Sequence, residues 1–213
     1  MKIDAPPLPD TAALHVRDLS SPHAGPFTLD VAAGECLAIR GPSGAGKSLL
    51  LRMIADLDAN TGDVSLNGRS REQMSAPEWR RNVIYQAAEP AWWEATAAEH
   101  FRPGQMPLVK TLLPRLALAP ETLNTDISRL STGERQRMAL IRSLACNPQV
   151  LLLDEPTAAL DQATTMLVED LLRECLQAKL ALVLVTHSTE QATRLGHRQM
   201  SIAKADLTKA DFS

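Results

Sequence analysis

The residues from 41 to 48 form a continuous motif whose glycines and polar end suit phosphate binding. They match the pattern G-x-x-x-x-G-K-[S/T] in full. Glycines let the backbone turn its N–H groups towards an anion, Lys47 adds a mobile positive charge for the outer phosphates, and the Ser48 hydroxyl suits Mg²⁺. The alternative is a glycine-rich turn with an exposed lysine. The positions predicted to bind the phosphates are Gly41, Pro42, Ser43, Gly44, Ala45, Gly46, Lys47, Ser48 and Leu49.

The neighbours of this motif are those that a phosphate loop needs. An apolar run at 36–39 predicts a strand before it, and residues 49–55 predict a helix after it. The N-terminal end of that helix carries partial positive charge and favours a bound anion. The loop is therefore expected to hold a nucleoside triphosphate.

A second acidic motif follows the apolar run at 150–153. Asp154 stands at the end of this predicted strand, and Glu155 comes next. An aspartate at a strand tip beside a phosphate loop can hold magnesium, so we expect Asp154 and Ser48 to be the metal ligands. Side chains of a strand alternate in direction, which leaves Glu155 free to act as general base on water. The alternative is a strand that ends in a solvated acidic turn.

The rest of the chain alternates strands with helices, which predicts an α/β fold with a mainly parallel sheet. The stretch 89–130 contains five prolines between short apolar clusters, so it is expected to form several short helices of an inserted lobe. The Asn67-Gly68 dipeptide predicts a turn after 61–66, and 166–177 has the spacing of an amphipathic helix. Further strands are predicted at 13–16, 27–31, 83–85 and 180–185.

By these motifs the sequence resembles the ATP-binding cassette (ABC) ATPase family over nearly its whole length. Residues 130–137, Leu-Ser-Thr-Gly-Glu-Arg-Gln-Arg, resemble the family signature LSGGQ. Residues 156–161 resemble the D-loop, 184–187 resemble the switch strand that ends in a histidine, and Gly34-Glu35 is also typical. The resemblance implies a P-loop NTPase (RecA-like) core, an N-terminal antiparallel β subdomain and a short inserted helical lobe at about 89–130, all in one cassette over 1–213.

The resemblance also implies a head-to-tail dimer with two ATP molecules in its seam. Each ATP would be held by the phosphate loop of one subunit and by Ser131, Gly133 and Glu134 of the other, with Asp161 at the seam. His187 would sense the γ-phosphate beside the catalytic Glu155. The residues themselves predict that Ser131 caps a helix and that Glu134 completes a Ser-x-x-Glu capping box.

Three positions depart from the family pattern. Ala88 stands where a glutamine usually links Mg²⁺ and water to the helical lobe, and the nearest glutamine, Gln86, lies two positions earlier. Thr132 replaces a glycine of the signature. Where an aromatic residue usually stacks on adenine, the chain offers Pro22 and His23, and His23 either stacks or is a surface histidine.

Trp92 and Trp93 are adjacent, so we do not expect the two side chains to be buried together on the same face. Related cassettes receive the coupling helix of the membrane subunit in this region. We therefore expect one tryptophan to be a contact anchor, because tryptophan is favoured at interface hot spots; packing within the lobe is the alternative.

With 45% hydrophobic and 22% charged residues, the composition is that of an ordinary globular protein. A net charge of −3 and the absence of a basic excess argue against nucleic-acid binding. No apolar run approaches the roughly 18 residues of a membrane span, and the N-terminal MKIDAPPLPD has no secretory apolar region and predicts an extended tail. The three cysteines are expected to be buried apolar residues in a reducing compartment.

The predicted protein is thus the ATP-hydrolysing subunit of an ABC transporter, with Mg²⁺ as cofactor. We expect it in the cytoplasm at the inner face of the membrane. Its expected partners are a second, identical cassette and a separate permease. Details of the signature resemble bacterial cassettes described as metal or iron exporters. The alternatives are a degenerate cassette with weak hydrolysis and an ABC ATPase of DNA maintenance.

Overall fold

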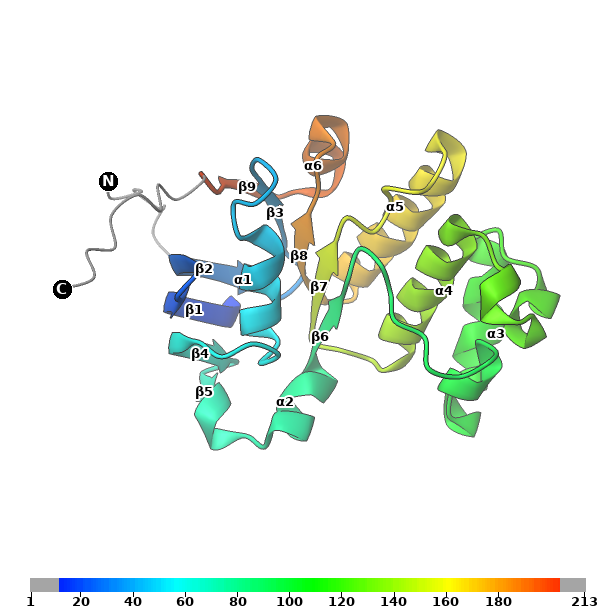
Figure 1. Ribbon diagram of the computed structural model, residues 1–213, viewed down its shortest axis with the longest axis horizontal. Coiled ribbons are helices and arrows are strands. Elements are labelled where there is room, and N and C mark those ends of the chain that lie inside the picture. Colours follow the sequence, from blue (N-terminus) through cyan, green and yellow to red (C-terminus); the bar gives the residue numbers. More distant parts are fainter. Residues whose placement is uncertain (1–11, 204–213) are drawn as a thin grey trace.

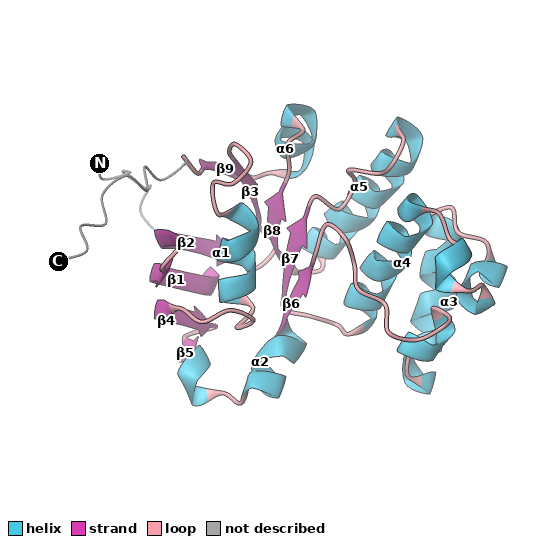
Figure 2. Ribbon diagram, in the orientation of Figure 1, coloured by secondary structure: helices cyan, strands magenta, loops and turns pink. Residues whose placement is uncertain are grey.

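The computed structural model describes residues 12–203, so the predicted N-terminal tail lies outside the described residues. Two sheets and the helices around them make up this part of the chain (Figure 1, Figure 2). Along the longest axis, an antiparallel sheet lies at one end, a parallel sheet in the middle and the helices α3 and α4 at the other end (Figure 1).

The central sheet has five strands in the order β6-β7-β8-β3-β9, and every neighbouring pair is parallel. Each residue of β7 and β8 is buried, as the continuous apolar runs predict for strands covered on both faces. The strands are β3 (Cys36–Arg40), β6 (Val83–Gln86), β7 (Val150–Asp154), β8 (Ala181–Val185) and β9 (Arg198–Ser201).

The second sheet is antiparallel, in the order β2-β1-β4-β5. Asn67 and Gly68 both have positive φ, 50° and 77°, and form the predicted turn between β4 and β5. β4 also pairs with β1, which the sequence did not predict. The strands are β1 (Ala12–Ser21), β2 (Ala24–Ala32), β4 (Thr61–Leu66) and β5 (Arg69–Ser70).

The helices that pack on the parallel sheet include both predicted ones. The helix predicted at 49–55 begins two residues earlier, because the turn of the glycine loop already places Lys47 in helical conformation. The helix predicted at 166–177 begins earlier, where Asp161 caps it. The helices are α1 (Lys47–Ile54), α2 (Ala76–Asn82), α4 (Thr132–Ala145), α5 (Gln162–Gln177) and α6 (Thr189–Leu195).

The proline-containing stretch forms short helical segments. Its one α-helix, α3 (Met106–Arg115), has Pro107 in the first turn, where no N–H partner is lost, and Pro114 close to its end. The remaining segments are 3₁₀ turns, η2 (Ala98–His100), η3 (Pro103–Gln105), η4 (Pro120–Asn124) and η5 (Ile127–Arg129). A further 3₁₀ turn, η1 (Arg71–Gln73), follows β5.

The apolar core has two parts, one on each face of the parallel sheet. Leu152 and Val183 face the part that contains α1 and the antiparallel sheet, whereas Leu151 and Leu153 face α3, α4 and α5. Trp79 is fully buried in the first part and donates from Nε1 to the carbonyl of Ile54 at 2.9 Å. The parallel sheet is thereby fixed from both sides.

The expectation that all three cysteines are buried is met in full only by Cys36. Cys36 is fully buried in β3, and burial raises the pKa of its thiol to about 12. Cys175 is partly buried, but Cys146 is exposed because it follows the last turn of α4. None of the helices found between residues 12 and 203 has both the length and the apolar character to span a bilayer.

Candidate functional site

The carboxyl ends of three neighbouring strands set out the site. Val185 of β8 lies level with Ile39 of β3 on one side and with Asp154 of β7 on the other. The amide of Thr186 donates to the carbonyl of Ile39 at 3.3 Å, which continues the register past the strand ends. The glycine loop, the two acids and His187 therefore leave the sheet at the same edge.

The glycine loop wraps around the start of α1. Gly44 and Gly46 have φ of 77° and 88°, a conformation that side chains rarely adopt. Lys47 is 7% exposed, and its Nζ donates to the carbonyl oxygens of Gly41 and Pro42 at 2.8 and 2.9 Å. Ser48 is exposed in the first turn of α1. The loop thus presents backbone amides, one ammonium group and one hydroxyl at a helix N-terminus.

The turn between β1 and β2 lies beside this loop. A Cβ at Gly46 would stand 2.8 Å from the Cβ of Ala24. His23 is exposed in the same turn, and its backbone amide donates to Ser21 Oγ at 3.3 Å. The side chain of His23 is therefore accessible near the loop, on the side where an adenine partner was expected.

Asp154 is 5% exposed at the end of β7. Its Oδ2 accepts a hydrogen bond from the hydroxyl of Tyr85 in β6 at 3.2 Å. Burial, and secondarily the neighbouring charge of Asp154, raise the pKa of Tyr85 far above its ordinary value, which keeps the phenol protonated as a donor. The phenol thereby orients Oδ2 of Asp154 and does not bond to Oδ1.

Glu155 has an unusual backbone, with φ of 49°, in the left-handed region. Its Oε2 accepts from the backbone N–H of His187 at 3.3 Å, and His187 Nε2 lies 3.4 Å from Oε1 without forming a hydrogen bond. Burial raises the pKa of Glu155, and the contacts with His187 partly oppose this effect. A partly buried carboxylate of raised pKa beside a phosphate loop is suited to accept a proton.

The start of α4 carries the predicted capping box. Ser131 Oγ accepts from the amide of Glu134 at 3.2 Å, and Glu134 Oε2 accepts from the amide of Ser131 at 2.8 Å. The hydroxyl of Ser131 also donates to Glu134 Oε2 at 2.7 Å. This hydrogen bond, followed by the one from the amide of Ser131, lowers the pKa of Glu134. Glu134 therefore folds back onto the helix end and does not extend freely from it.

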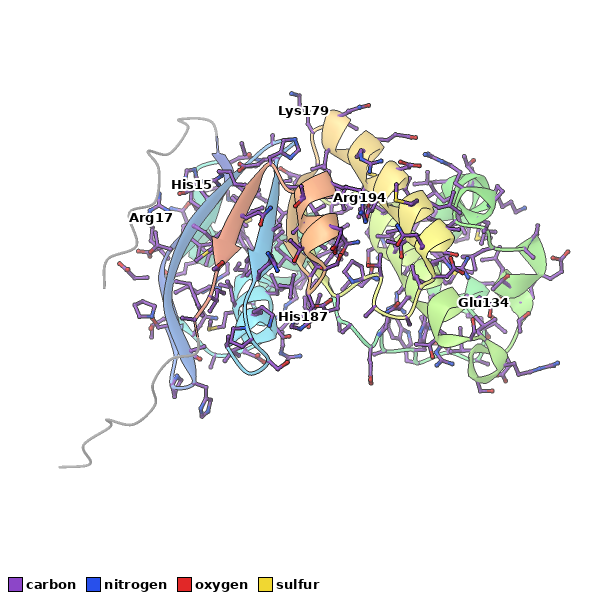
Figure 3. All side chains as sticks on the ribbon, turned by 90° about the horizontal axis from the view of Figure 1, so that it is seen from above. His15, Arg17, Glu134, Lys179, His187 and Arg194 are labelled. Carbon is purple, nitrogen blue, oxygen red and sulfur yellow. The ribbon has the colours of Figure 1, made fainter. Side chains whose placement is uncertain are left out.

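Gly133 lies against the loop that leads into α5. A Cβ at this position would stand 3.0 Å from Leu160 Cδ2 and 3.2 Å from the carbonyl of Ala159. Asp161 caps α5 by accepting from the amide of Thr164 at 2.7 Å, which lowers its pKa. Figure 3 shows Glu134 on the helical side of the molecule, apart from His187. One chain thus brings the glycine loop, both acids and His187 together, and leaves Ser131, Gly133 and Glu134 elsewhere.

The departures from the family pattern have structural consequences. Gln86 is buried and bonded to α4, since it donates to the carbonyl of Gln136 at 3.4 Å and accepts from Ser143 Oγ at 3.3 Å. The carbonyl of Ala88 accepts from Gln136 Nε2 at 3.1 Å. Sequence reasoning missed the contact of Tyr85 with Asp154 and that of Gln136 with Ala88.

The oxygen donors at the strand edge fit magnesium. Among residues 12–203, no group of three or more histidine, cysteine, aspartate or glutamate side chains is placed to hold a metal ion. Mg²⁺ is commonly held by one carboxylate or hydroxyl together with substrate phosphates, so the pair of Asp154 and Ser48 is a suitable donor set.

The two tryptophans differ as their adjacency predicts. Trp92 packs against the core of the helical side, whereas Trp93 is 68% exposed. The guanidinium carbon of Arg142 lies 4.3 Å from the ring centre of Trp92 and 4.9 Å from that of Trp93. His100 meets both rings edge-on.

Comparison with known proteins gives consistent results. The family model described as "ABC transporter" matches residues 25–158. The aliphatic sulfonates import ATP-binding protein SsuB 2 of Burkholderia cenocepacia is 37% identical over 184 residues, which cover 83% of this chain and 67% of that protein. A protein of the same name from Rhizobium johnstonii is 36% identical over 209 residues, 93% of this chain and 80% of the relative.

Solved structures share the fold. The dimeric structure of the bacterial ABC transporter cassette MJ0796 has a TM-score of 0.79 at 27% identity, with 90% of this chain and 94% of that chain covered. The dimer described as a post-hydrolysis state bound to ADP and Pi has a TM-score of 0.78 at 25% identity, with 89% and 94% covered. Neither these proteins nor the two relatives favour the alternatives of a degenerate cassette or a DNA-maintenance ATPase.

Proposed function

The chain belongs to the ATP-binding cassette family of transporter ATPases, and from that premise we propose which of its residues bind and hydrolyse the nucleotide. It is the ATP-binding and ATP-hydrolysing subunit of an ABC transporter. The observation that carries the assignment of roles is the meeting of Lys47, Asp154, Glu155 and His187 at one strand edge.

The glycine loop holds the triphosphate. Its backbone N–H groups and the N-terminal end of α1 attract the phosphates, and Lys47 exchanges its two carbonyl partners for the outer phosphate oxygens. Ser48 and Asp154 hold Mg²⁺, and the hydrogen bond from Tyr85 supports the orientation of Asp154. When bound, the metal neutralises charge on the β- and γ-phosphate oxygens.

Glu155 and His187 serve the hydrolytic step. Glu155 accepts the proton of the attacking water, for which its raised pKa is suited because an ordinary glutamate is a weaker base. His187, whose side chain is 58% exposed, donates a hydrogen bond to the γ-phosphate. The contact between the two side chains keeps the base next to the residue that touches the substrate.

A second copy of the chain completes the site. In one chain the start of α4, where Glu134 lies, is apart from His187 (Figure 3), so a head-to-tail partner is needed to present Ser131 and Gly133 to the nucleotide. The capped start of α4 offers backbone N–H groups and a hydroxyl to the γ-phosphate of that partner. Asp161, next to the signature at the start of α5, lies in the seam of this homodimer.

The permease binds the helical side of the cassette at the inner face of the membrane. Trp93 is exposed beside a cation, a combination found at interface hot spots. We take Trp93 as the contact residue and Trp92 as its support in the core. The relatives named above are import proteins, which favours import over the export that details of the signature suggested.

The test of the site is ATP turnover by the purified chain with magnesium. Wild type is expected to hydrolyse ATP, Lys47→Ala to lose nucleotide affinity, and Glu155→Gln to retain affinity while turnover falls by roughly a thousandfold. Glu155→Gln is also expected to accumulate as a dimer with ATP. Turnover by Glu155→Gln at the wild-type rate would exclude the assigned base.

The permease contact is tested by comparing the two tryptophans. Trp93→Ala is expected to lower permease-stimulated ATPase activity and leave the melting temperature unchanged, because its ring is mainly solvated. Trp92→Ala is expected to lower the melting temperature, because its ring packs in the core. A Trp93→Ala variant with full coupled activity would contradict the docking role.

A further inference from the structure

We propose that Gln136 is a positioning residue for hydrolysis, linking the loop after β6 to the backbone of Glu155. The inference rests on the proposed role of Glu155 as the base. It adds a residue that does not touch the nucleotide but determines how the base and the neighbouring loops are held relative to one another.

One buried amide joins three segments of the site. Gln136 is 4% exposed in α4, and its Nε2 donates to the carbonyl of Ala88 at 3.1 Å and to that of Glu155 at 3.5 Å. Its Oε1 accepts from the amide of Ala159 at 3.3 Å. The loop after β6, the end of the acidic motif and the loop before α5 therefore share one side chain.

The contact with Glu155 concerns a strained residue. Left-handed backbone is unfavourable for residues other than glycine and persists where its surroundings fix it. Here the amide of Glu155 donates to the carbonyl of Val185 at 3.0 Å, and its carbonyl accepts from Ala158 at 3.2 Å as well as from Gln136. Gln136 thus helps to hold the peptide that sets the direction of the carboxylate.

The contact with Ala88 connects this peptide to the loop that carries Trp92 and Trp93. Further along the same loop, the carbonyl of Ala91 accepts from Arg142 Nη1 at 3.0 Å, and Arg142 stacks on Trp92. Gln136 and Arg142 are six residues apart on α4, about 9 Å along the helix axis. The loop is therefore attached to α4 at two points, so a displacement of the loop is passed to α4 and to Glu155.

Gln136 makes a connection that Ala88 and Gln86 do not. Ala88 has no side-chain amide, but its main-chain carbonyl reaches Gln136. Gln86 has both polar atoms bonded to α4, to the carbonyl of Gln136 and to Ser143. Among the described residues, the link between this loop and the base is thus a backbone carbonyl on one side and the Gln136 amide on the other.

The test compares Gln136 with a glutamine that has similar bonds but no role at the site. Gln136→Glu keeps the size and an acceptor for Ala159 but loses the donor for Ala88 and Glu155. Gln136→Met removes both polar atoms without adding charge, and provides a second variant if the glutamate variant folds poorly. The control is Gln105→Glu, since Gln105 donates to the carbonyl of Ala145 at 2.9 Å and accepts from the amide of Arg102 at 2.8 Å.

For the Gln136 variants, kcat of the full chain is expected to fall roughly tenfold or more, because small misplacement of a catalytic group is costly. ATP affinity should stay within about twofold, since the glycine loop is untouched. Gln105→Glu should keep its kcat. Equal losses of kcat in the Gln105 and Gln136 variants, or full activity of the Gln136 variants, would overturn the inference.

A second readout follows the connection itself. In a Glu155→Gln background, ATP binding is expected to change amide hydrogen exchange in residues 87–97, and Gln136→Met should abolish that change while the glycine loop remains protected. An unchanged response in residues 87–97 would overturn the inference. Absence of ATPase activity in the wild-type chain would instead overturn the proposed site and this inference with it, so the two failures are distinguishable.

Discussion

The capping box at the start of α4 allows structural and functional roles of the signature to be separated. Ser131→Ala removes the oxygen that accepts from the amide of Glu134, and Glu134→Ala removes the oxygen that accepts from the amide of Ser131. Loss of an N-cap costs about 1 kcal/mol, and loss of the return hydrogen bond costs about the same. For a domain of this size, each variant should lower the melting temperature by about 2–4 °C.

The two variants should differ in ATP-driven dimerisation. The Ser131 hydroxyl is proposed to bond to the γ-phosphate of the partner, and a hydrogen bond to a charged group is worth about 1.5–3 kcal/mol. Its loss should weaken the dimer by roughly 10- to 100-fold at each seam site. Glu134→Ala also removes a negative charge near the phosphates, so its dimer should be at least as stable as that of the parent.

The assay is sedimentation of each variant in a Glu155→Gln background with Mg-ATP, beside thermal melting of the same samples. Glu134→Gln is the matched control, because the side-chain oxygen of the glutamine can still accept from the backbone amide of Ser131 while the negative charge is lost. If Ser131→Ala melts a few degrees lower but dimerises as tightly as the parent, the residue is only a helix cap. The proposed contact across the seam would then be refuted.

Two further outcomes are expected. Because partial burial raises the pKa of Glu155 above the ordinary glutamate value of 4.5, the base is protonated and inactive already at a higher pH than an ordinary glutamate. The acid limb of the kcat–pH profile should therefore lie above pH 4.5, and a limb at or below pH 4.5 would contradict this assignment of the base. Hydrogen bonds from Ser131 lower the pKa of Glu134, so the ionised Glu134 stabilises the folded chain fully above about pH 4.5, and this stabilisation is lost as the pH falls through the lower pKa of the folded state. The difference in unfolding free energy between wild type and Glu134→Gln should therefore narrow at that low pH. A difference that does not depend on pH would show that the ionisation of Glu134 does not contribute to stability.

The sequence was most informative where local chemistry fixes the structure. The glycine loop, the strand that ends in Asp154 and the Ser131–Glu134 capping box depend on residues a few positions apart, so their spacing predicts them. The parallel sheet follows from apolar runs such as 150–153. The strand order within that sheet was not predicted.

What the sequence did not predict depends on contacts between distant segments. Tyr85 reaches Asp154 across two paired strands, and Gln136 reaches Ala88 across the interface of a helix and a loop. Neither contact has a pattern within a short stretch of sequence. The first depends on which strands are neighbours in the sheet, and the second depends on the rotation of α4 relative to the sheet, which packing determines. The left-handed backbone of Glu155 was likewise unexpected, since β-strand alternation alone was used to orient it.

The position of β8 between β7 and β3 has a consequence for how this site can vary. Since Val185 is level with both Ile39 and Asp154, the register of β8 fixes how far the glycine loop after β3 lies from Asp154 and Glu155, and this separation can change only by whole residues. A shift of register would move one group past the other by about 3.3 Å and reverse the side on which every side chain lies. Surface helices and loops are therefore free to diverge while the two halves of the reaction centre keep a constant separation.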